Sequence, residues 1–460
     1  MMKILNFKVV GVRGFLTKNI SFRDNVTFLV GINGSGKTTI LELMYGLLNP
    51  DLKSLFTIDY KEISLICELG AKSKFKKKTI QVISKKQDDN FVIAYRDANA
   101  SIYETFSFPI IHSIDLYETE WNSAFSEIDI NFSKSSVWSL IKQLSTPVIL
   151  NLNRFLPSFT DFDVPFRMSH SESLRKTHMK NDDISRALFY VQELVYWNIR
   201  RTARQQNKLA EDFKNKVFEE MFTSPQEIGF NFFSQKSVES SKISDLRETL
   251  KSVGSLDEET GKLTQKVDRY LADYEQTLEK YLASRQGEKK GKMNDVEFKL
   301  LQKMLVYDLQ YDKIIKIAEF ARDNMIEVKK LHDPLDRFVE SVNLFFKEGN
   351  KEIRLAGNGD ILVINHNKGA NVHDSIFNLS SGEKQLVILM ACLSLPEQSK
   401  LSRVYVVDEP EVSLHITWQE QFVDALLKAS PDTQFILATH SPSIIAKTER
   451  RNWCEDLTMI

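Results

Sequence analysis

Apolar and polar positions alternate over short stretches at both ends of the chain and recur at helical spacing in its middle. Strand-length apolar runs near the N-terminus are separated by polar turns such as residues 85–90. These predicted strands cover residues 3–10, 26–30, 61–69, 79–84, 91–96 and 148–157. A helix is expected at residues 39–48. Further on, residues 386–395 predict an apolar helix, and residues 404–407 and 435–438 predict buried strands.

The middle of the chain carries two series of apolar and aromatic residues at spacings of three and four. They are Leu263, Val267, Tyr270, Tyr274, Leu278 and Tyr281, then Leu301, Met304, Tyr311, Ile315, Ala318, Arg322 and Met325. A glycine-bearing turn at residues 286–292 separates them, which predicts an antiparallel coiled-coil hairpin. Arms of about thirty residues would reach roughly 45 Å. A plain helical subdomain is the alternative, and the polar residues 158–184 are expected to form a mobile loop.

A glycine-rich loop lies between the strand 26–30 and the helix 39–48. It reads Gly-Ile-Asn-Gly-Ser-Gly-Lys-Thr from residue 31 to residue 38, which matches G-x-x-x-x-G-K-[ST] in its proper context. In such a loop backbone N–H groups cradle phosphates, Lys37 neutralises the outer phosphates, and Thr38 offers a hydroxyl to Mg²⁺. The chain is therefore expected to bind ATP and Mg²⁺. The candidate residues are Gly31, Asn33, Gly34, Ser35, Gly36, Lys37, Thr38 and Thr39.

Three further segments follow in a fixed order beyond residue 375. Leu-Ser-Ser-Gly-Glu-Lys-Gln spans residues 379–385, Asp-Glu-Pro-Glu spans 408–411, and Thr-His-Ser spans 439–441. With the glycine-rich loop they resemble the ABC-type ATPase heads of the SMC, Rad50, RecF and OLD group. The resemblance implies an α/β P-loop head split into N- and C-terminal lobes, with an inserted helical or coiled-coil subdomain. The expected boundaries are 1–157, 158–345 and 346–460.

The resemblance also implies a role for each motif. Asp408 would hold Mg²⁺ together with Thr38, because Mg²⁺ takes few carboxylates. Glu409 would be the base that activates water, while Lys37 and the metal ion neutralise the γ-phosphate. His440 would contact that phosphate. Glu411 and residues 413–415 occupy the place of the loop that contacts a second copy in this family.

In the resembled family, the signature segment reaches the nucleotide of a partner subunit. Ser380, Ser381, Gly382 and Glu383 would present backbone N–H groups and hydroxyls to that phosphate. Two heads would then sandwich two ATP molecules, which predicts a homo-oligomer. Ser380 and Glu383 also form the pattern of a helix capping box, and both interpretations can hold together.

Two weaker candidates have structural alternatives. Asn153 and Arg154 follow the apolar run at 148–152 and are candidates for positioning water, although a core strand with a capping arginine explains them equally. Lysines 72, 74, 76, 77 and 78 crowd one turn. They are candidates for nucleic-acid contact, but charge at a hairpin edge also guards against strand aggregation.

Composition adds little to these motifs. The 460 residues carry 61 basic and 62 acidic side chains, so overall charge gives no argument for nucleic-acid binding. Three scattered cysteines favour a reducing compartment. The sequence shows neither a signal peptide nor a run of about 20 apolar residues that could span a bilayer. We therefore expect a cytoplasmic protein without a membrane partner.

The variant signature and the Asp-Glu-Pro-Glu segment are similar to those of the OLD-like branch. About twenty residues follow His440, too few for the nuclease domain of OLD enzymes, so ATP hydrolysis is the only activity expected. The pattern looks like the ATPase subunits of two-gene antiphage systems, PtuA of Septu or AriA of PARIS. The implied partner is a separate nuclease of the HNH or TOPRIM type, with a phage trigger. A RecF- or Rad50-like repair ATPase that clamps DNA is the alternative function.

Overall fold

The fold is described from a computed structural model. The residues described are 2–70, 77–87, 89–97, 100, 102–110, 118–144, 147–151, 183–222, 258–285, 295–368, 373–395 and 404–458. The chain folds into two compact units, one of Met1–Trp197 with Pro334–Ile460 and one of Asn198–Asp333. Residues 183–197 and 334–345, which the sequence analysis assigns to the insert, thus group with the terminal lobes.

A five-stranded parallel sheet forms the centre of the first unit, in the order β14-β3-β13-β12-β8. Its strands are β3 (Val26–Val30), β8 (Val148–Asn151), β12 (Val404–Asp408), β13 (Gln434–Thr439) and β14 (Cys454–Asp456). β13 is buried at every position and β3 at all but its last, as expected of strands covered on both faces. The strands predicted at 26–30, 404–407 and 435–438 are confirmed.

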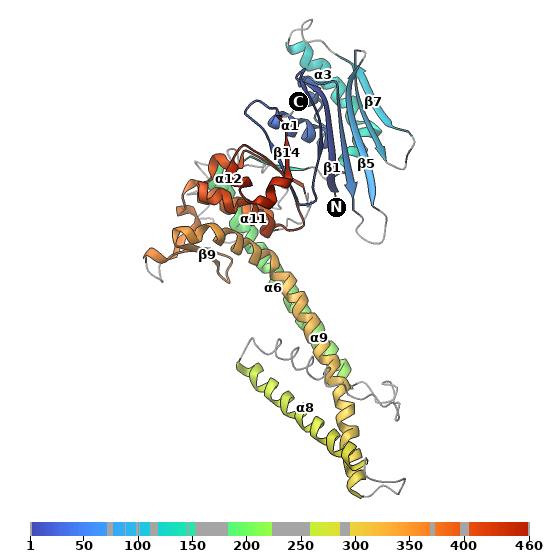
Figure 1. Ribbon diagram of the computed structural model, residues 1–460, viewed down its shortest axis with the longest axis vertical. Coiled ribbons are helices and arrows are strands. Elements are labelled where there is room, and N and C mark those ends of the chain that lie inside the picture. Colours follow the sequence, from blue (N-terminus) through green and yellow to red (C-terminus); the bar gives the residue numbers. More distant parts are fainter. Residues whose placement is uncertain are drawn as a thin grey trace. The chain divides into compact units, whose positions relative to one another are not determined.

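A six-stranded antiparallel sheet, in the order β2-β1-β4-β5-β6-β7, belongs to the same unit (Figure 1). Its strands are β1 (Met2–Val12), β2 (Leu16–Ser21), β4 (Glu62–Leu69), β5 (Lys78–Gln87), β6 (Asn90–Asp97) and β7 (Glu104–Pro109). The helices of this lobe are α1 (Lys37–Leu48), α2 (Leu52–Thr57), α3 (Glu118–Ser133) and α4 (Ser136–Lys142). The polar turn predicted at 85–90 is shorter, because the pairing of β5 with β6 continues as far as Gln87 and Asn90.

One buried side chain joins these two sheets. The Gln434 amide donates to the carbonyls of Ile4 (2.7 Å) and Arg23 (2.8 Å), and its oxygen accepts from the Ile4 N–H at 2.8 Å. Gln434 is 1% exposed. Because Ile4 lies on β1 and Gln434 begins β13, these bonds tie the antiparallel sheet to the parallel one.

The C-terminal lobe adds a small sheet and several helices. Its three-stranded sheet has the order β11-β10-β9, formed by β9 (Lys351–Leu355), β10 (Ile361–Asn365) and β11 (His373–Ser375). The α-helices are α10 (Ser381–Ser394), α11 (Ile416–Ala429) and α12 (Pro442–Ile445). The 3₁₀ turns are η1 (Lys347–Gly349), η2 (His366–Lys368), η3 (Ile376–Asn378), η4 (Pro410–Ser413) and η5 (Thr448–Trp453).

Two close contacts fix parts of this lobe. The β9–β10 turn places Gly359 at φ +96°, where an added Cβ would lie 2.8 Å from the Tyr196 ring. Arg450 is buried on η5 and donates to Asp424 Oδ1 of α11 at 2.6 Å and to the Ile444 carbonyl at 3.0 Å. Both contacts leave little room for substitution.

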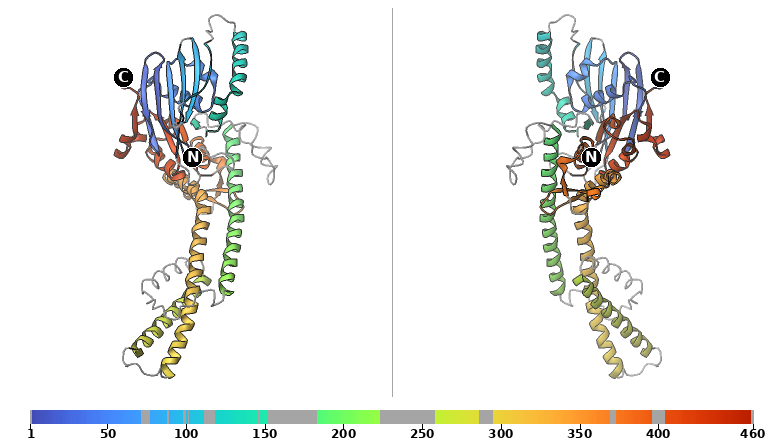
Figure 2. Two further views of the ribbon diagram at one scale, coloured as in Figure 1. Left: turned by 90° about the vertical axis from the view of Figure 1, so that its right-hand side faces the viewer. Right: turned by 90° about the vertical axis from the view of Figure 1, so that its left-hand side faces the viewer.

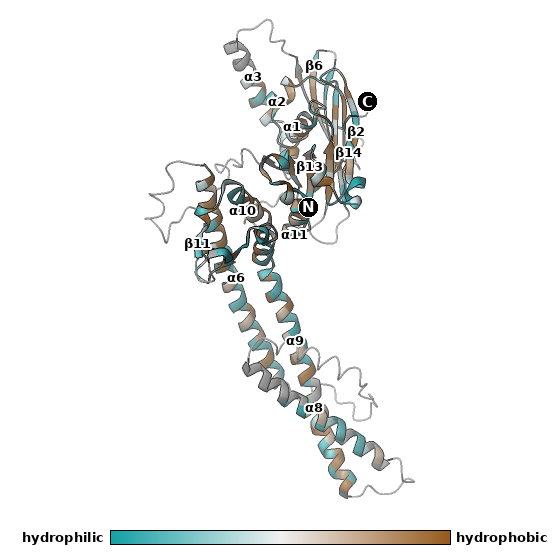
Figure 3. Cartoon of the chain, turned by 60° about the vertical axis from the view of Figure 1, so that its left-hand side comes forward, coloured by the Kyte–Doolittle hydropathy of each residue, from teal (hydrophilic) through white to brown (hydrophobic). Residues whose placement is uncertain are grey.

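Within the described residues, the second unit consists of α8 (Glu258–Arg285), the C-terminal part of α6 (Asp183–Phe222) and the N-terminal part of α9 (Asp295–Phe346). Figure 2 shows α6 and α9 side by side in both views, and Thr202 of α6 donates to the Leu331 carbonyl of α9. Polar and apolar residues alternate along both helices (Figure 3). α8 packs on the start of α9 through Leu271, Tyr274 and Ala318.

The arrangement of α6, α8 and α9 differs from the predicted two-helix hairpin. α8 and α9 are the two predicted helices, but α9 has 52 residues and spans about 78 Å, longer than the 45 Å expected. α6 is the additional partner of α9, and it begins at Asp183, inside the predicted loop. No helix within the described ranges is long and apolar enough to cross a bilayer.

Candidate functional site

The carboxyl ends of three parallel strands bring the predicted motifs to one edge of the central sheet. Val30 of β3 pairs with Thr439 of β13, and Ala438 pairs with Asp408 of β12. The glycine-rich loop, the Asp-Glu-Pro segment and the Thr-His-Ser segment therefore leave the sheet side by side. Ligands of open α/β sheets bind at this edge.

The glycine-rich loop has the backbone that a phosphate cradle requires. Gly36 precedes α1 at φ +92°, a left-handed conformation that side chains rarely adopt. An added Cβ on Gly31 would lie 2.5 Å from Ser35 Oγ, so this position also has no space for a side chain. Asn33 and Gly34 are exposed, and Thr39 is buried under the loop.

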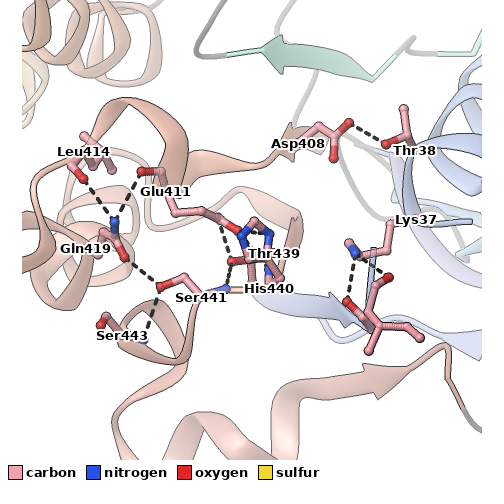
Figure 4. Close-up of polar contacts among 12 residues, drawn as sticks. Lys37, Thr38, Asp408, Glu411, Leu414, Gln419, Thr439, His440, Ser441 and Ser443 are labelled. Carbon is pink, nitrogen blue, oxygen red and sulfur yellow. Dashed lines mark hydrogen bonds and ion pairs between the residues drawn. The ribbon is translucent and has the colours of Figure 1, made fainter. Parts of the chain in front are cut away.

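Lys37 lies inside this loop. Its side chain is almost fully buried, and Nζ donates to the carbonyls of Gly31 at 2.8 Å and Ile32 at 3.2 Å (Figure 4). The ammonium group is therefore held by the turn that would enclose the phosphates.

Thr38 and Asp408 meet although 370 positions separate them. Thr38 Oγ1 donates to Asp408 Oδ2 at 3.0 Å. Burial raises the pKa of Asp408, and the hydrogen bond from Thr38 opposes that shift. A hydroxyl beside a carboxylate at the end of a strand is a donor set that suits Mg²⁺.

Two buried atoms at this edge support a polar ligand. Ser35 Oγ and Asp408 Oδ1 have no hydrogen-bond partner among the residues that the structure describes. Leaving such an atom unsatisfied costs about 1–3 kcal/mol. The residues present thus fit a phosphate and its magnesium ion.

Glu409 follows Asp408 in a strained conformation. Its φ of +49° is unusual for a residue with a side chain, and its N–H donates to the Ala438 carbonyl at 2.9 Å. Glu409 is half-buried, and no hydrogen bond or ion pair holds its carboxylate within the described ranges. It is therefore the acid of the Asp-Glu-Pro segment whose oxygens are available to a water molecule.

His440 and Glu411 form a pair that the sequence analysis did not predict. His440 Nδ1 lies 2.9 Å from Glu411 Oε1. Glu411 occupies the place of a loop that contacts a second copy in the resembled family, and its own carboxylate is buried and accepts from the Thr439 hydroxyl and the His440 N–H. The sequence shows that a glutamate follows Asp-Glu-Pro, but it does not indicate in which direction this side chain points.

The signature segment has the expected capping box. Ser380 Oγ accepts from the Glu383 N–H, and Glu383 Oε2 accepts from the Ser380 N–H at 2.9 Å. Burial acts to raise the pKa of Glu383, but hydrogen bonds from Lys351 and Ser380 outweigh it and lower the pKa. Ser380 and Ser381 are exposed, and Gly382 is half-buried. Their contact with a second copy stays a prediction.

The remaining candidates fall outside the described residues. They are Asn153, Arg154, lysines 72, 74 and 76, the loop 158–182 and the turn 286–292. β8 ends at Asn151, which pairs with Asp408. Water positioning by Asn153 and Arg154 therefore stays a prediction.

Comparison with known families identifies the chain. Residues 26–446 match the model described as "AAA domain, putative AbiEii toxin, Type IV TA system". The chain belongs to this AAA-domain family. The matched residues include the glycine-rich loop, the signature, and the Asp-Glu-Pro and Thr-His-Ser segments. With the parallel sheet, the family confirms the predicted fold class, an α/β ABC-type P-loop head with a helical insert.

Two similar proteins are named as retron components. The "Retron Vc95 probable ATPase" of Vibrio cholerae is 38% identical over 80 residues, which cover 15% of this chain and 16% of the relative. The "Retron Ec83 probable ATPase" of Escherichia coli is 25% identical over 185 residues, 36% of this chain and 33% of the relative. This AAA-domain chain thus spans a third or less of these relatives.

Solved SMC head domains are similar over nearly the whole AAA-domain chain. That of Thermotoga maritima is 12% identical with a TM-score of 0.41, covering 100% of this chain and 95% of the other. A head from Pyrococcus furiosus, bound to the C-terminal domain of ScpA, is 14% identical with a TM-score of 0.38 and covers 97% and 92%.

Proposed function

We propose that this protein binds and hydrolyses ATP at the carboxyl edge of its parallel sheet. The observation that carries the proposal is the meeting of Thr38 with Asp408, which joins the two most distant motifs. The buried ammonium of Lys37 and the unsatisfied atoms beside it support the same ligand. Relatives named as probable ATPases agree with it.

Each residue of the candidate site has a separate role in the proposed ATP hydrolysis. Lys37 and the loop N–H groups bind the phosphates, and Thr38 with Asp408 would hold Mg²⁺, which when bound neutralises phosphate charge. Glu409 orients the attacking water and accepts its proton. His440 contacts the outer phosphate.

Two variants test this assignment. Lys37→Ala should abolish binding of a fluorescent ATP analogue, whereas Glu409→Gln should bind it normally and lose at least about a hundredfold in turnover. Glu348→Gln is a matched control, because the partners of this exposed acid among the described residues are Thr417 and Gln421, which both donate to it. Normal turnover by the Glu409→Gln protein would exclude Glu409 as the base.

We also propose that two heads enclose two ATP molecules between them. The exposed serines that begin α10 lie at a helix N-terminus, which attracts anions. Sedimentation of the Glu409→Gln protein should show a dimer with Mg-ATP and a monomer with ADP. Adding Ser380→Arg should prevent the dimer, and a dimer that persists would place the interface elsewhere.

The cellular role that we propose is antiphage defence together with a separate nuclease. The proposal is supported by the family description, which names a "putative AbiEii toxin, Type IV TA system", and by two relatives named as probable ATPases of retrons. Phage plating on cells that express the locus should rise with Lys37→Ala or Glu409→Gln. DNA binding that needs ATP but no other protein, and weakens steeply with salt, would instead support a DNA clamp.

A further inference from the structure

Glu411 accepts two hydrogen bonds from residues at the end of β13 and lies at ion-pair distance from the ring of His440. Oε2 accepts from Thr439 Oγ1 at 2.7 Å, and Oε1 lies 2.8 Å from the His440 N–H and 2.9 Å from His440 Nδ1 (Figure 4). The Glu411 side chain is 7% exposed, whereas that of His440 is 46% exposed. The carboxylate is thus buried behind a ring that faces outward.

The direction of these bonds follows from the groups involved. A backbone N–H can only donate, and it shares Oε1 with Nδ1, so this oxygen is an acceptor for both. Thr439 Oγ1 accepts from the Ser441 N–H at 3.0 Å, which leaves its own hydrogen for Oε2. Nδ1 therefore carries a proton, and Nε2 is the ring nitrogen left for a ligand.

A second side chain holds the same two segments together. Gln419 of α11 donates to the carbonyls of Glu411 (3.2 Å) and Leu414 (3.0 Å), and its oxygen accepts from Ser441 Oγ at 2.6 Å. The turn that carries Glu411 and the segment that carries His440 are therefore fixed to each other by two side chains, those of Glu411 and Gln419.

We propose that Glu411 is a positioning residue that acts through His440. It holds the imidazole ring in one orientation and in the tautomer with hydrogen on Nδ1, so that Nε2 is presented to the outer phosphate of ATP. Contact with a phosphate oxygen then requires a second proton on Nε2, and Glu411 balances the resulting charge. Glu411 does not serve as the base, because both its oxygens are occupied. The inference rests on the proposed ATP site.

The tautomer can be tested without nucleotide. Protein labelled with ¹⁵N in the histidine rings, at a pH where they are neutral, should show His440 with Nδ1 protonated and Nε2 bare. His440→Asn assigns the signal by its loss. Glu411→Ala should move hydrogen to Nε2, while Glu348→Gln should leave the signals of His440 unchanged. A wild-type ring protonated only on Nε2, or an unchanged spectrum for Glu411→Ala, overturns the inference.

Turnover supplies an independent readout. Glu411→Ala should lower kcat about tenfold or more, the loss expected from removing a hydrogen bond to a charged group, and leave ADP affinity unchanged. The double variant with His440→Ala should be no slower than His440→Ala alone, because Glu411 acts through that ring. Additive losses overturn the inference.

Glu411→Gln guards against a folding defect in the alanine variant. The amide keeps the shape and an oxygen that accepts from Nδ1, so the tautomer should persist while kcat still falls with the lost charge. A wild-type protein that shows the Nδ1 tautomer but no ATPase activity would contradict the proposed function and not the orientation of His440. The two failures are therefore distinguishable.

Discussion

Replacing Gln434 with leucine tests whether a single amide holds the two sheets of the first unit together. Leucine has a similar volume but cannot replace the three hydrogen bonds of 2.7–2.8 Å. The change leaves the N–H and carbonyl of Ile4 and the carbonyl of Arg23 without partners in a site where Gln434 is 1% exposed.

The magnitude follows from those unsatisfied groups. Each costs about 1–3 kcal/mol when buried, so three give roughly 3–6 kcal/mol after some water has entered at Arg23, which lies nearer the surface. The loss is a large fraction of an ordinary folding free energy of about 5–15 kcal/mol. We expect Gln434→Leu to lower the urea midpoint of unfolding and to speed amide exchange in β1.

The matched control is Gln421→Leu. This glutamine makes one exposed hydrogen bond to Glu348, so its loss should shift stability by less than about 0.5 kcal/mol. If Gln434→Leu unfolds at the same urea concentration as the wild type, with unchanged exchange at Ile4, the two sheets are joined by their apolar contacts and the reasoning is wrong.

Two further substitutions test the packing of the C-terminal lobe. Burial acts to raise the pKa of Asp424, but hydrogen bonds from Arg450 and a neighbouring lysine outweigh it and lower the pKa. The stabilisation is then fully present above the unfolded pKa of about 3.9 and is lost as pH falls through the lower folded value. Asp424→Asn should therefore cost about 1–2 kcal/mol at pH 7, and in denaturant titrations this cost should decrease progressively as pH falls from ~4 through the folded pKa. Gly359→Ala should cost about 1–3 kcal/mol, seen as a lower melting temperature, because its Cβ meets Tyr196, whereas Gly357→Ala, with open space around it, should be neutral. Equal melting temperatures for the two alanine variants, or a constant Asp424→Asn effect across pH, would contradict these contacts.

Local patterns predict the central strands well, and the order of the motifs predicts which segments meet at the edge of the sheet. Val26–Val30 is apolar except for Thr27, and residues 435–438 form a continuous apolar run, as a parallel strand covered on both faces requires. The meeting of Thr38 with Asp408 follows from motif order, because the carboxyl ends of parallel strands share one edge of a sheet.

Features that depend on side-chain direction are not predictable in this way. Nothing in the spacing of Glu411 indicates that its carboxylate turns back to His440 instead of toward a second copy. Gln434 resembles any polar residue at the start of a strand, and only the approach of Ile4 and Arg23 gives it three hydrogen bonds.

The length of α9 shows how packing overrides local preference. Pro334 lacks an N–H, and a proline normally ends or bends a helix. The apolar series in the sequence predicts a helix only as far as Met325. The helix continues because the residues beyond the proline bury apolar side chains at helical spacing. They are Leu335, Phe338, Val342, Phe345 and Phe346.

The pairing of Thr38 with Asp408 also determines how late in translation the candidate site can form. At roughly 5–20 residues per second, a ribosome needs about 20–75 s to add the 370 positions between them. During that interval the nascent chain exposes the apolar β3 without β13 beside it. The candidate site is therefore assembled late in translation, and the emerging N-terminal lobe is a natural client for chaperones until the last strands arrive.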